Sequence, residues 1–302
     1  MEPTSPPTAA PVVRAPRHWR VVARSLGSLL AGLVMVLGAV LLVRKGLVPL
    51  VDALWHPGPA WLGMVRRAGI FIAAIAAYWA YVRGFERRPA TELRPRPLRA
   101  LLGGAGGALM IGLPIAALFL SGAYQAVLFR GASPALWGVA AVILIAALLE
   151  ELVYRALVFR VLERALGTGV ALPLQALLFA LPHLENLSHG NGYEVASLLV
   201  SVTVLGLLWG ALFVLSRNLW VPVAHHAAWN FTIVLSGVPL SGIGDWRTLA
   251  PLESRYAGPA WMTGGQFGPE ASLLVIATSA IAVAWLLRVA KRRGCFVARA
   301  AA

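Results

Sequence analysis

The sequence has little cysteine and little charge. Its one cysteine, Cys295, can form no internal disulfide, so no disulfide framework supports the fold. Charged residues make up only 13% of the 302 positions, against 59% hydrophobic residues, and the mean hydropathy is +0.76. Soluble domains carry about 25% charged residues. The composition therefore excludes an ordinary soluble domain and indicates an integral membrane protein.

Acidic residues are scarce, which leaves a net charge of +14 from 26 Lys and Arg against 12 Asp and Glu. Such an excess is typical of nucleic-acid binding or of loops that orient a membrane protein. The basic residues gather in the N-terminal tail, in residues 83–99, around Arg164, at Arg217 and in residues 288–293, which are alternate loops of a helix bundle. The positive-inside rule then places both termini in the cytoplasm, and we expect no nucleic-acid partner. Four basic residues lie on the outer side and oppose this topology: Arg44, Lys45, Arg66 and Arg67.

Long apolar runs dominate the rest of the chain. A helix needs about 20 apolar residues to cross a bilayer, and eight runs of suitable length occur. We therefore predict an all-α fold, a polytopic membrane helix bundle of about eight transmembrane helices. The runs cover residues 26–43, 67–83, 100–121, 135–163, 169–187, 195–216, 218–237 and 271–289.

No internal repeat and no separate soluble domain are apparent, so we predict one membrane domain with two tails. Residues 1–25 are basic and begin Pro-rich, which predicts a disordered tail. The first apolar run ends without a small-residue cleavage site, so we interpret it as a retained span and not as a signal peptide. The membrane domain covers residues 26–293, with its polar motifs in 135–235, and the second tail covers 294–302. We expect the protein in a bacterial inner (plasma) membrane.

Three charges interrupt the fourth apolar run: Glu150, Glu151 and Arg155. A charge near the centre of a transmembrane helix costs about 2.5–3.5 kcal/mol, whereas each Leu or Ile returns only about 0.3–0.6 kcal/mol. The charges therefore need partners inside the bundle. Glu151 and Arg155 are four residues apart and can pair on one helix face. Glu150 lies about 100° around the helix from Glu151; it is either a reactive group or part of a structural ion-pair network.

Two other runs carry polar side chains. His183 occurs in LFALPHLEN, and His226 and Asn230 occur four residues apart in VPVAHHAAWNF. At 1.5 Å per residue, Glu150 and these three side chains lie about 12–21 Å from the cytoplasmic helix ends. The four groups can therefore meet. His225, next to His226, is the residue most easily mistaken for it.

The three motifs resemble those of the CAAX prenyl protease and bacteriocin-processing (abortive-infection) family of intramembrane endopeptidases. The family's two glutamates followed by an arginine resemble EELVYR at residues 150–155. Its phenylalanine and histidine, four apart, resemble FALPH at residues 179–183, and its histidine and asparagine resemble HAAWN at residues 226–230. The resemblance covers roughly residues 135–235.

The resemblance implies a peptide hydrolase, an intramembrane protease of the CAAX-processing type that cleaves a membrane-associated protein or peptide in the lipid bilayer. Glu150 and His183 would hold and activate water, and His226 and Asn230 would stabilise the oxyanion of the tetrahedral intermediate. The supporting residues implied by the motifs are Glu151, Arg155 and Phe179.

Two alternatives remain open. In a metalloprotease-like version, Glu150, His183 and His226 would bind zinc, whose water attacks. The helical His-Glu-x-x-His signature is absent, and we expect no metal cofactor. The other alternative is a transporter or proton relay lined by intramembrane ionisable groups, but the sequence lacks the paired, similarly interrupted halves of such a protein.

Overall fold

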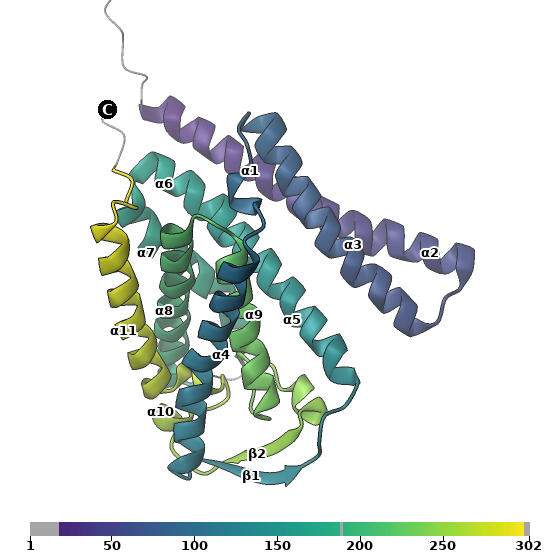
Figure 1. Cartoon of the computed structure of the whole chain (residues 1–302), viewed down its shortest axis with the longest axis vertical. Coiled ribbons are helices and arrows are strands. Elements are labelled where there is room, and N and C mark those ends of the chain that lie inside the picture. The colour runs from purple at the N-terminus through teal and green to yellow at the C-terminus, as the bar shows by residue number, and fades with distance from the viewer. Residues whose placement is uncertain (1–17, 188–189, 299–302) are drawn as a thin grey trace, which may run out of the picture.

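The computed structural model describes residues 18–187 and 190–298, and these form a helix bundle with a small two-stranded sheet at one end (Figure 1). The predicted all-α membrane fold is confirmed. The disordered tail predicted for residues 1–25 is wrong for residues 18–25, which form the start of a helix, and its residues 1–17 lie outside the described residues. Residues 299–302 of the second tail also lie outside them. The α-helices are α1 (His18–Leu42), α2 (Val48–Trp55), α3 (Pro59–Ala80), α4 (Pro97–Leu120), α5 (Ala135–Glu151), α6 (Arg160–Leu166), α7 (Thr168–Ala180), α8 (Gly192–Ser216), α9 (Trp220–Leu235), α10 (Ala260–Thr263) and α11 (Leu273–Arg292).

Wide π-helical turns join some of these helices into longer rods. The turn η1 (Val43–Leu47) connects α1 to α2, and η2 (Tyr81–Phe85) extends α3. A third, η4 (Leu152–Phe159), connects α5 to α6. It begins directly after Glu151 and contains Arg155. Such turns often occur at functional sites.

Each of the eight predicted apolar runs is mostly helical, but not all of the helices are long. Among the described residues, six helical segments are long and apolar enough to cross a membrane. The two remaining predicted runs fall mainly in α7 and α9, which contain 13 and 16 residues, fewer than the roughly 20 that a span needs. The helix α7 ends where Pro182, which has no N–H, enters the 3₁₀ turn η5 (Leu181–Asn186). The six segments are Arg24–Trp55, Pro59–Phe85, Pro97–Leu120, Ala135–Leu166, Gly192–Ser216 and Leu273–Arg292.

Glycines allow α4 and α9 to touch backbone to backbone. A β-carbon at Gly107 would lie 2.1 Å from the carbonyl oxygen of His225, and one at Gly103 would lie 2.8 Å from that of Val221. The two glycines are four residues apart and so share a helix face, as in other membrane helix pairs. The contact fixes α9, which carries the third motif, against α4.

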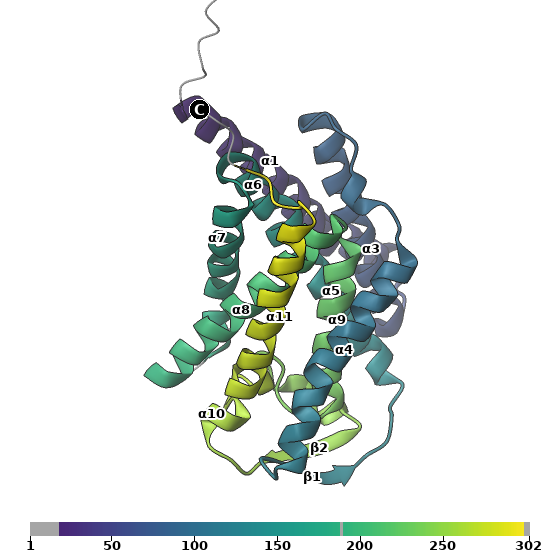
Figure 2. The ribbon, with the colours of Figure 1, turned by 60° about the vertical axis from the view of Figure 1, so that its left-hand side comes forward.

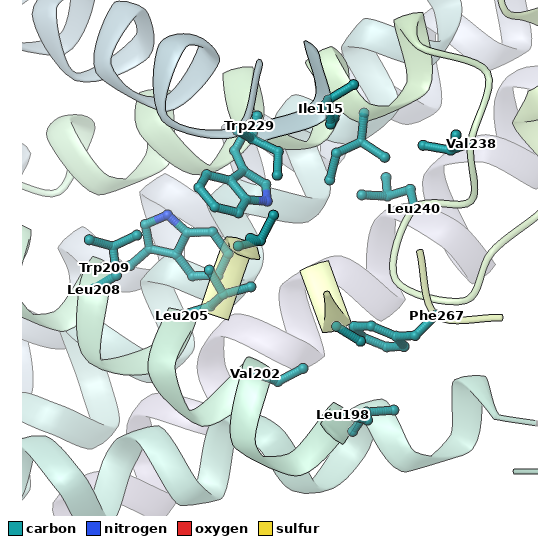
Figure 3. Packing of buried hydrophobic residues seen from close by; sticks show 14 of the residues in the cluster. Ile115, Leu198, Val202, Leu205, Leu208, Trp209, Trp229, Val238, Leu240 and Phe267 are labelled. Atoms are coloured by element: carbon teal, nitrogen blue, oxygen red, sulfur yellow. The ribbon is translucent and has the colours of Figure 1, made fainter. Parts of the chain in front are cut away.

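The main hydrophobic core lies between α4, α5, α8, α9 and α11, with Trp209 and Trp229 at its centre (Figure 3). The segment after α9 closes one end of this core. There β1 (Tyr124–Phe129) pairs antiparallel with β2 (Leu252–Tyr256). This sheet and two short 3₁₀ turns, η6 (Asp245–Leu249) and η7 (Pro269–Ala271), form a cap over that end. The cap brings loop residues that are remote in sequence against the ends of α5 and α9.

The described ends of the chain, the start of α1 and the end of α11, lie at the same end of the bundle in both views (Figures 1 and 2). Basic side chains at this end pair with a few acids. Glu92, in η3 (Thr91–Leu93), is only 4% exposed and lies 2.7 Å from Nη2 of Arg88 and 2.7 Å from Nη1 of Arg160. These ion pairs attach the connection before α4 to the start of α6.

Candidate active site

One cavity of about 90 Å³ brings the three motifs together. All four residues predicted to be catalytic line it, from α5, η5 and α9. The loop that follows α9 closes the cavity. The lining residues are Ile143, Ala146, Glu150, His183, Asn186, His226, Asn230, Leu240, Ser241, Ile243 and Trp246.

The adjacent carboxylates of Glu150 and Glu151 have different surroundings. The Glu150 side chain is 35% exposed and reaches the cavity, whereas that of Glu151 is fully buried. Oε2 of Glu150 has no hydrogen-bond partner within the described residues and lies 3.8 Å from Nε2 of His226. Glu150 is therefore the carboxylate that water or a substrate can reach.

Glu151 pairs with two cations or potential cations. Its Oε1 lies 3.1 Å from Nη1 of Arg155, as the spacing predicts, and 2.9 Å from Nδ1 of His226. The contact with His226 has no counterpart in the sequence pattern because the two residues come from different helices. Glu151 therefore ties the first motif to the third.

Arg155 is held on several sides. Its side chain is fully buried, and Nη2 donates a hydrogen bond of 3.1 Å to the carbonyl oxygen of Gly206. The guanidinium carbon lies 4.5 Å from the centre of the Phe179 ring, a cation–π distance. Phe179, expected to be a supporting residue, thus covers the cation of the buried ion pair.

His183 has a defined ring orientation. Its Nδ1 lies 2.9 Å from the carbonyl oxygen of Phe179. A carbonyl can only accept a hydrogen bond, so Nδ1 carries the proton and Nε2 of the neutral ring holds the lone pair. The ring centre also lies 4.8 Å from that of Phe179. His183 can therefore accept a hydrogen bond in the cavity that it lines.

Trp209 of α8 contacts both adjacent histidines of α9, each in a different way. Its ring stacks on His226 at a centroid distance of 3.7 Å and an angle of 15°, while its Nε1 donates to Nδ1 of His225 over 3.1 Å. His226 lines the cavity and His225 does not. Trp209 is absent from the predicted site because its position in an evenly apolar helix gives no signal of a polar contact.

Asn230 lies one turn beyond His226 on the same helix. It is 9% exposed, and its Oδ1 has no hydrogen-bond partner among the described residues. Oδ1 of Asn230 and Oε2 of Glu150 are thus two unpartnered polar atoms of residues that line one cavity, and a water or a peptide group could bond to them there.

The loop over the cavity adds residues that the sequence analysis did not select. Nδ2 of Asn186 donates to the carbonyl oxygen of Ser241 over 2.8 Å, and Oγ of Ser241 donates to Oε2 of Glu270 over 2.6 Å. Glu270 is buried, and burial raises its pKa, although the Ser241 hydrogen bond and the charge of His226 oppose the rise. These contacts hold the loop in place.

The donor geometry gives no support to the zinc alternative. Within residues 18–187 and 190–298, no group of three or more His, Cys, Asp or Glu side chains could hold a metal ion. Both nitrogens of His226 face carboxylates, with Nδ1 on Glu151 and Nε2 towards Glu150.

Comparison with known families agrees with the three motifs. Residues 131–232 match the family model described as Type II CAAX prenyl endopeptidase Rce1-like. This segment is therefore similar to the Rce1-like family. It contains all three motifs, so the resemblance stated above is confirmed, and the Rce1-like family indicates a peptidase. With six candidate spans among the described residues, the chain is an integral membrane protein. No curated protein and no solved structure matches it.

Proposed function

We propose that the chain is an intramembrane endopeptidase that hydrolyses peptide bonds of membrane-associated proteins or peptides without a metal ion. The observation that carries this proposal is the single cavity lined by Glu150, His183, His226 and Asn230. Two of its polar atoms, Oε2 of Glu150 and Oδ1 of Asn230, have no partner within the described residues. The Rce1-like segment supports the reaction type.

The first step is attack by water. Glu150 accepts one proton of the water, and Nε2 of His183 accepts a hydrogen bond from the other. The fixed Nδ1 contact of His183 with Phe179 leaves Nε2 available for this role. As the water oxygen forms its bond to the peptide carbonyl carbon, its proton passes to Glu150.

The second step is stabilisation of the oxyanion. Nδ1 of His226 faces the Glu151 carboxylate at 2.9 Å, so this nitrogen is a donor. A donor at Nε2 as well requires a second proton on the ring. Glu151, held by Arg155, stabilises that imidazolium. The two carboxylates, Arg155 and protonated His226 then sum to zero charge, which lowers the cost of burying them.

Asn230 supplies the other donor, its amide N–H₂, one helical turn from His226. When the tetrahedral intermediate collapses, the carbon–nitrogen bond breaks and the proton on Glu150 passes to the leaving amine. The products are a new carboxyl terminus and a free amine. Glu150 returns to its starting state, so all atoms are accounted for by one water.

We also propose an orientation and a substrate class to test first. Both described ends of the chain lie at the basic end of the bundle, which supports cytoplasmic termini in a bacterial inner membrane. The family description names CAAX prenyl endopeptidases, so prenylated peptides are the first class of probe, beside unmodified membrane-anchored tails.

The test compares membrane proteins from cells that express the full-length wild type, Glu150→Gln or Glu185→Gln. Glu185 is an exposed carboxylate two residues from His183, and it provides the matched control. New protein termini should appear with the wild type and with Glu185→Gln, and should be missing with Glu150→Gln. Equal cleavage by Glu150→Gln would show that the base is wrongly assigned, and no new termini with the wild type would favour a transporter.

Metal dependence is tested separately. The purified protein should cleave an identified substrate at full rate after dialysis against a chelator, with no stoichiometric zinc by elemental analysis. Loss of activity in chelator and recovery with added zinc would establish the metalloprotease-like version instead.

A further inference from the structure

A second and larger cavity lies apart from the active site. It is a groove of about 660 Å³ between α4, α8, α9 and α11. Its walls are mostly apolar side chains, among them Met110, Leu212 and Trp285. Neither Glu150 nor His183 lines it. A groove of this kind on a membrane-spanning bundle offers a surface for an apolar chain.

The length of the groove matches half of a bilayer. Its lining residues on α4 run from Arg99 to Met110. At 1.5 Å per residue this is about 16 Å, whereas the hydrocarbon core of one leaflet is about 15 Å deep. An acyl chain that lay along α4 would therefore reach from the membrane interface to the bilayer centre.

Two arginines stand at the same end of the groove. Arg99 lies near the start of α4, and Arg293 directly follows α11; both line the groove and both are exposed. Within the described residues neither side chain has an ion pair, whereas Arg160 and Arg217 at this end of the bundle pair with glutamates. The two free guanidinium groups can hold a phosphate by charge-assisted hydrogen bonds.

We propose that this groove binds one anionic phospholipid, with an acyl chain along α4 and the phosphate between Arg99 and Arg293. The site belongs to the leaflet at the basic end of the bundle. It goes beyond the proposed protease reaction and does not depend on it. The lipid would also touch α9, because Val221 and His225 line the groove.

The contact with His225 gives the site a connection to the reaction centre. Nδ1 of His225 accepts the indole N–H of Trp209, whose ring stacks on His226. A bound acyl chain would therefore press on the same helix and tryptophan that position His226. Binding itself, however, is measurable without any substrate.

The experiment measures lipid binding to the full-length protein in a neutral detergent by native mass spectrometry. Dioleoyl phosphatidylglycerol and dioleoyl phosphatidylcholine are titrated separately. We expect one phosphatidylglycerol per chain, bound about tenfold or more tighter than phosphatidylcholine. The double variant Arg99→Gln/Arg293→Gln should lose this preference. The control Lys291→Gln/Arg292→Gln removes the same charge at the same end from residues outside the groove lining, and it should bind as the wild type does.

A second variant tests the apolar part. A β-carbon at Gly106 would meet only Cδ2 of His225, at 3.8 Å, which is an ordinary contact. The leucine of Gly106→Leu therefore fits at its β-carbon, and its outer carbons would fill the groove. It should abolish phosphatidylglycerol binding without lowering the thermal stability of the lipid-free protein. If Gly106→Leu fails to fold, Met110→Trp takes its place.

Three outcomes would overturn the proposal. The first is an equal loss of binding in the Lys291→Gln/Arg292→Gln control, which would mean general charge attraction. The second is normal binding by a folded groove-filling variant, which would mean that only the headgroup is held. The third is displacement of phosphatidylglycerol by inorganic phosphate at similar concentration, which would mean a site for a free anion.

Discussion

Oε1 of Glu151 lies 2.9 Å from Nδ1 of His226, although 75 positions separate the two residues in the chain. The same oxygen lies 3.1 Å from Nη1 of Arg155. One buried carboxylate thus orients a ring on another helix while its own position is fixed by a guanidinium. Glu151 is therefore a positioning residue, whose removal should disturb the orientation of the His226 ring.

Glu151→Gln should lower turnover by about 10²–10³, the effect of losing one oxyanion donor, because the amide no longer stabilises the second proton on His226. Apparent substrate affinity should change little, because Glu151 contacts His226 and does not line the cavity. The measurement is turnover and apparent affinity for a reconstituted substrate, together with thermal stability, and Glu185→Gln is the control. A loss of turnover that is matched by an equal loss of folded protein would assign Glu151 a purely structural role.

Arg155→Ala should destabilise the protein by about 3–5 kcal/mol, because it leaves the buried Glu151 carboxylate without its cation. Activity should fall as well. The control is Arg130→Ala, which breaks an ion pair with Glu253 in which the side chains are 34% and 41% exposed, and it should cost only about 0–1 kcal/mol. Unfolding in detergent compares the two. Equal stability losses would mean that the Arg155 pair is solvated in the membrane.

His226→Ala and Asn230→Ala should each lower turnover by about 10²–10³ with little change in apparent substrate affinity. Because the two donors serve one oxygen, the double variant should be only slightly slower than the slower single variant. Rates at saturating substrate measure this. Normal turnover with weakened affinity would instead move both residues from the reaction centre to substrate binding.

Gly107→Ala should destabilise the protein and inactivate it, because its β-carbon would lie 2.1 Å from the carbonyl oxygen of His225 and push α9 away from α4. The neighbouring Gly104→Ala is the matched control, since its β-carbon would meet Ala224 at 3.6 Å, an ordinary contact. Thermal unfolding and substrate cleavage are measured for both variants. If both behave as the wild type does, the helix pair is looser than the structure describes.

Stability should depend on pH through Glu270. Its pKa is raised in the folded protein, mainly by burial, so the folded state keeps this proton to higher pH than the unfolded state does. Stability from this group is therefore present at acid pH and is lost as pH rises. Glu270→Gln should be about as stable as the wild type at roughly pH 4, close to the ordinary pKa of a Glu carboxyl. At roughly pH 8 the variant should be the more stable of the two. Parallel unfolding curves at all pH values would contradict this.

Much of the site was predictable because charged and polar side chains cost free energy inside a membrane-spanning bundle. Glu150, His183, His226 and Asn230 stand out in apolar runs, and the 1.5 Å helical rise brings them to similar depths. The ion pair of Glu151 with Arg155 follows from their spacing. The structure agrees with the predicted meeting of these residues around one cavity.

Contacts across helices were not predictable in the same way. Trp209, Ser241 and Glu270 reach the site from segments whose local pattern is ordinary, and only the tertiary fold brings them there. The number of long spans was also overestimated, because hydropathy continues through Pro182 while the α-helix does not. Apolar character alone does not report where a helix ends.

The π-helical segment η4 sets the angle, about the helix axis, between the side chains of α5 and those of α6. On its α5 side, Glu151 faces His226, and on its α6 side, Arg160 faces Glu92. Relative to a regular α-helix, a wide turn holds about one extra residue, which rotates everything after it by about 100°. Deleting one residue from 156–159 would convert the wide turn to a regular one and turn Arg160 away from Glu92, while the spacing of Glu151 and Arg155 stays the same. Such a deletion would uncouple the reaction centre from its anchor at the basic end without removing a single catalytic side chain.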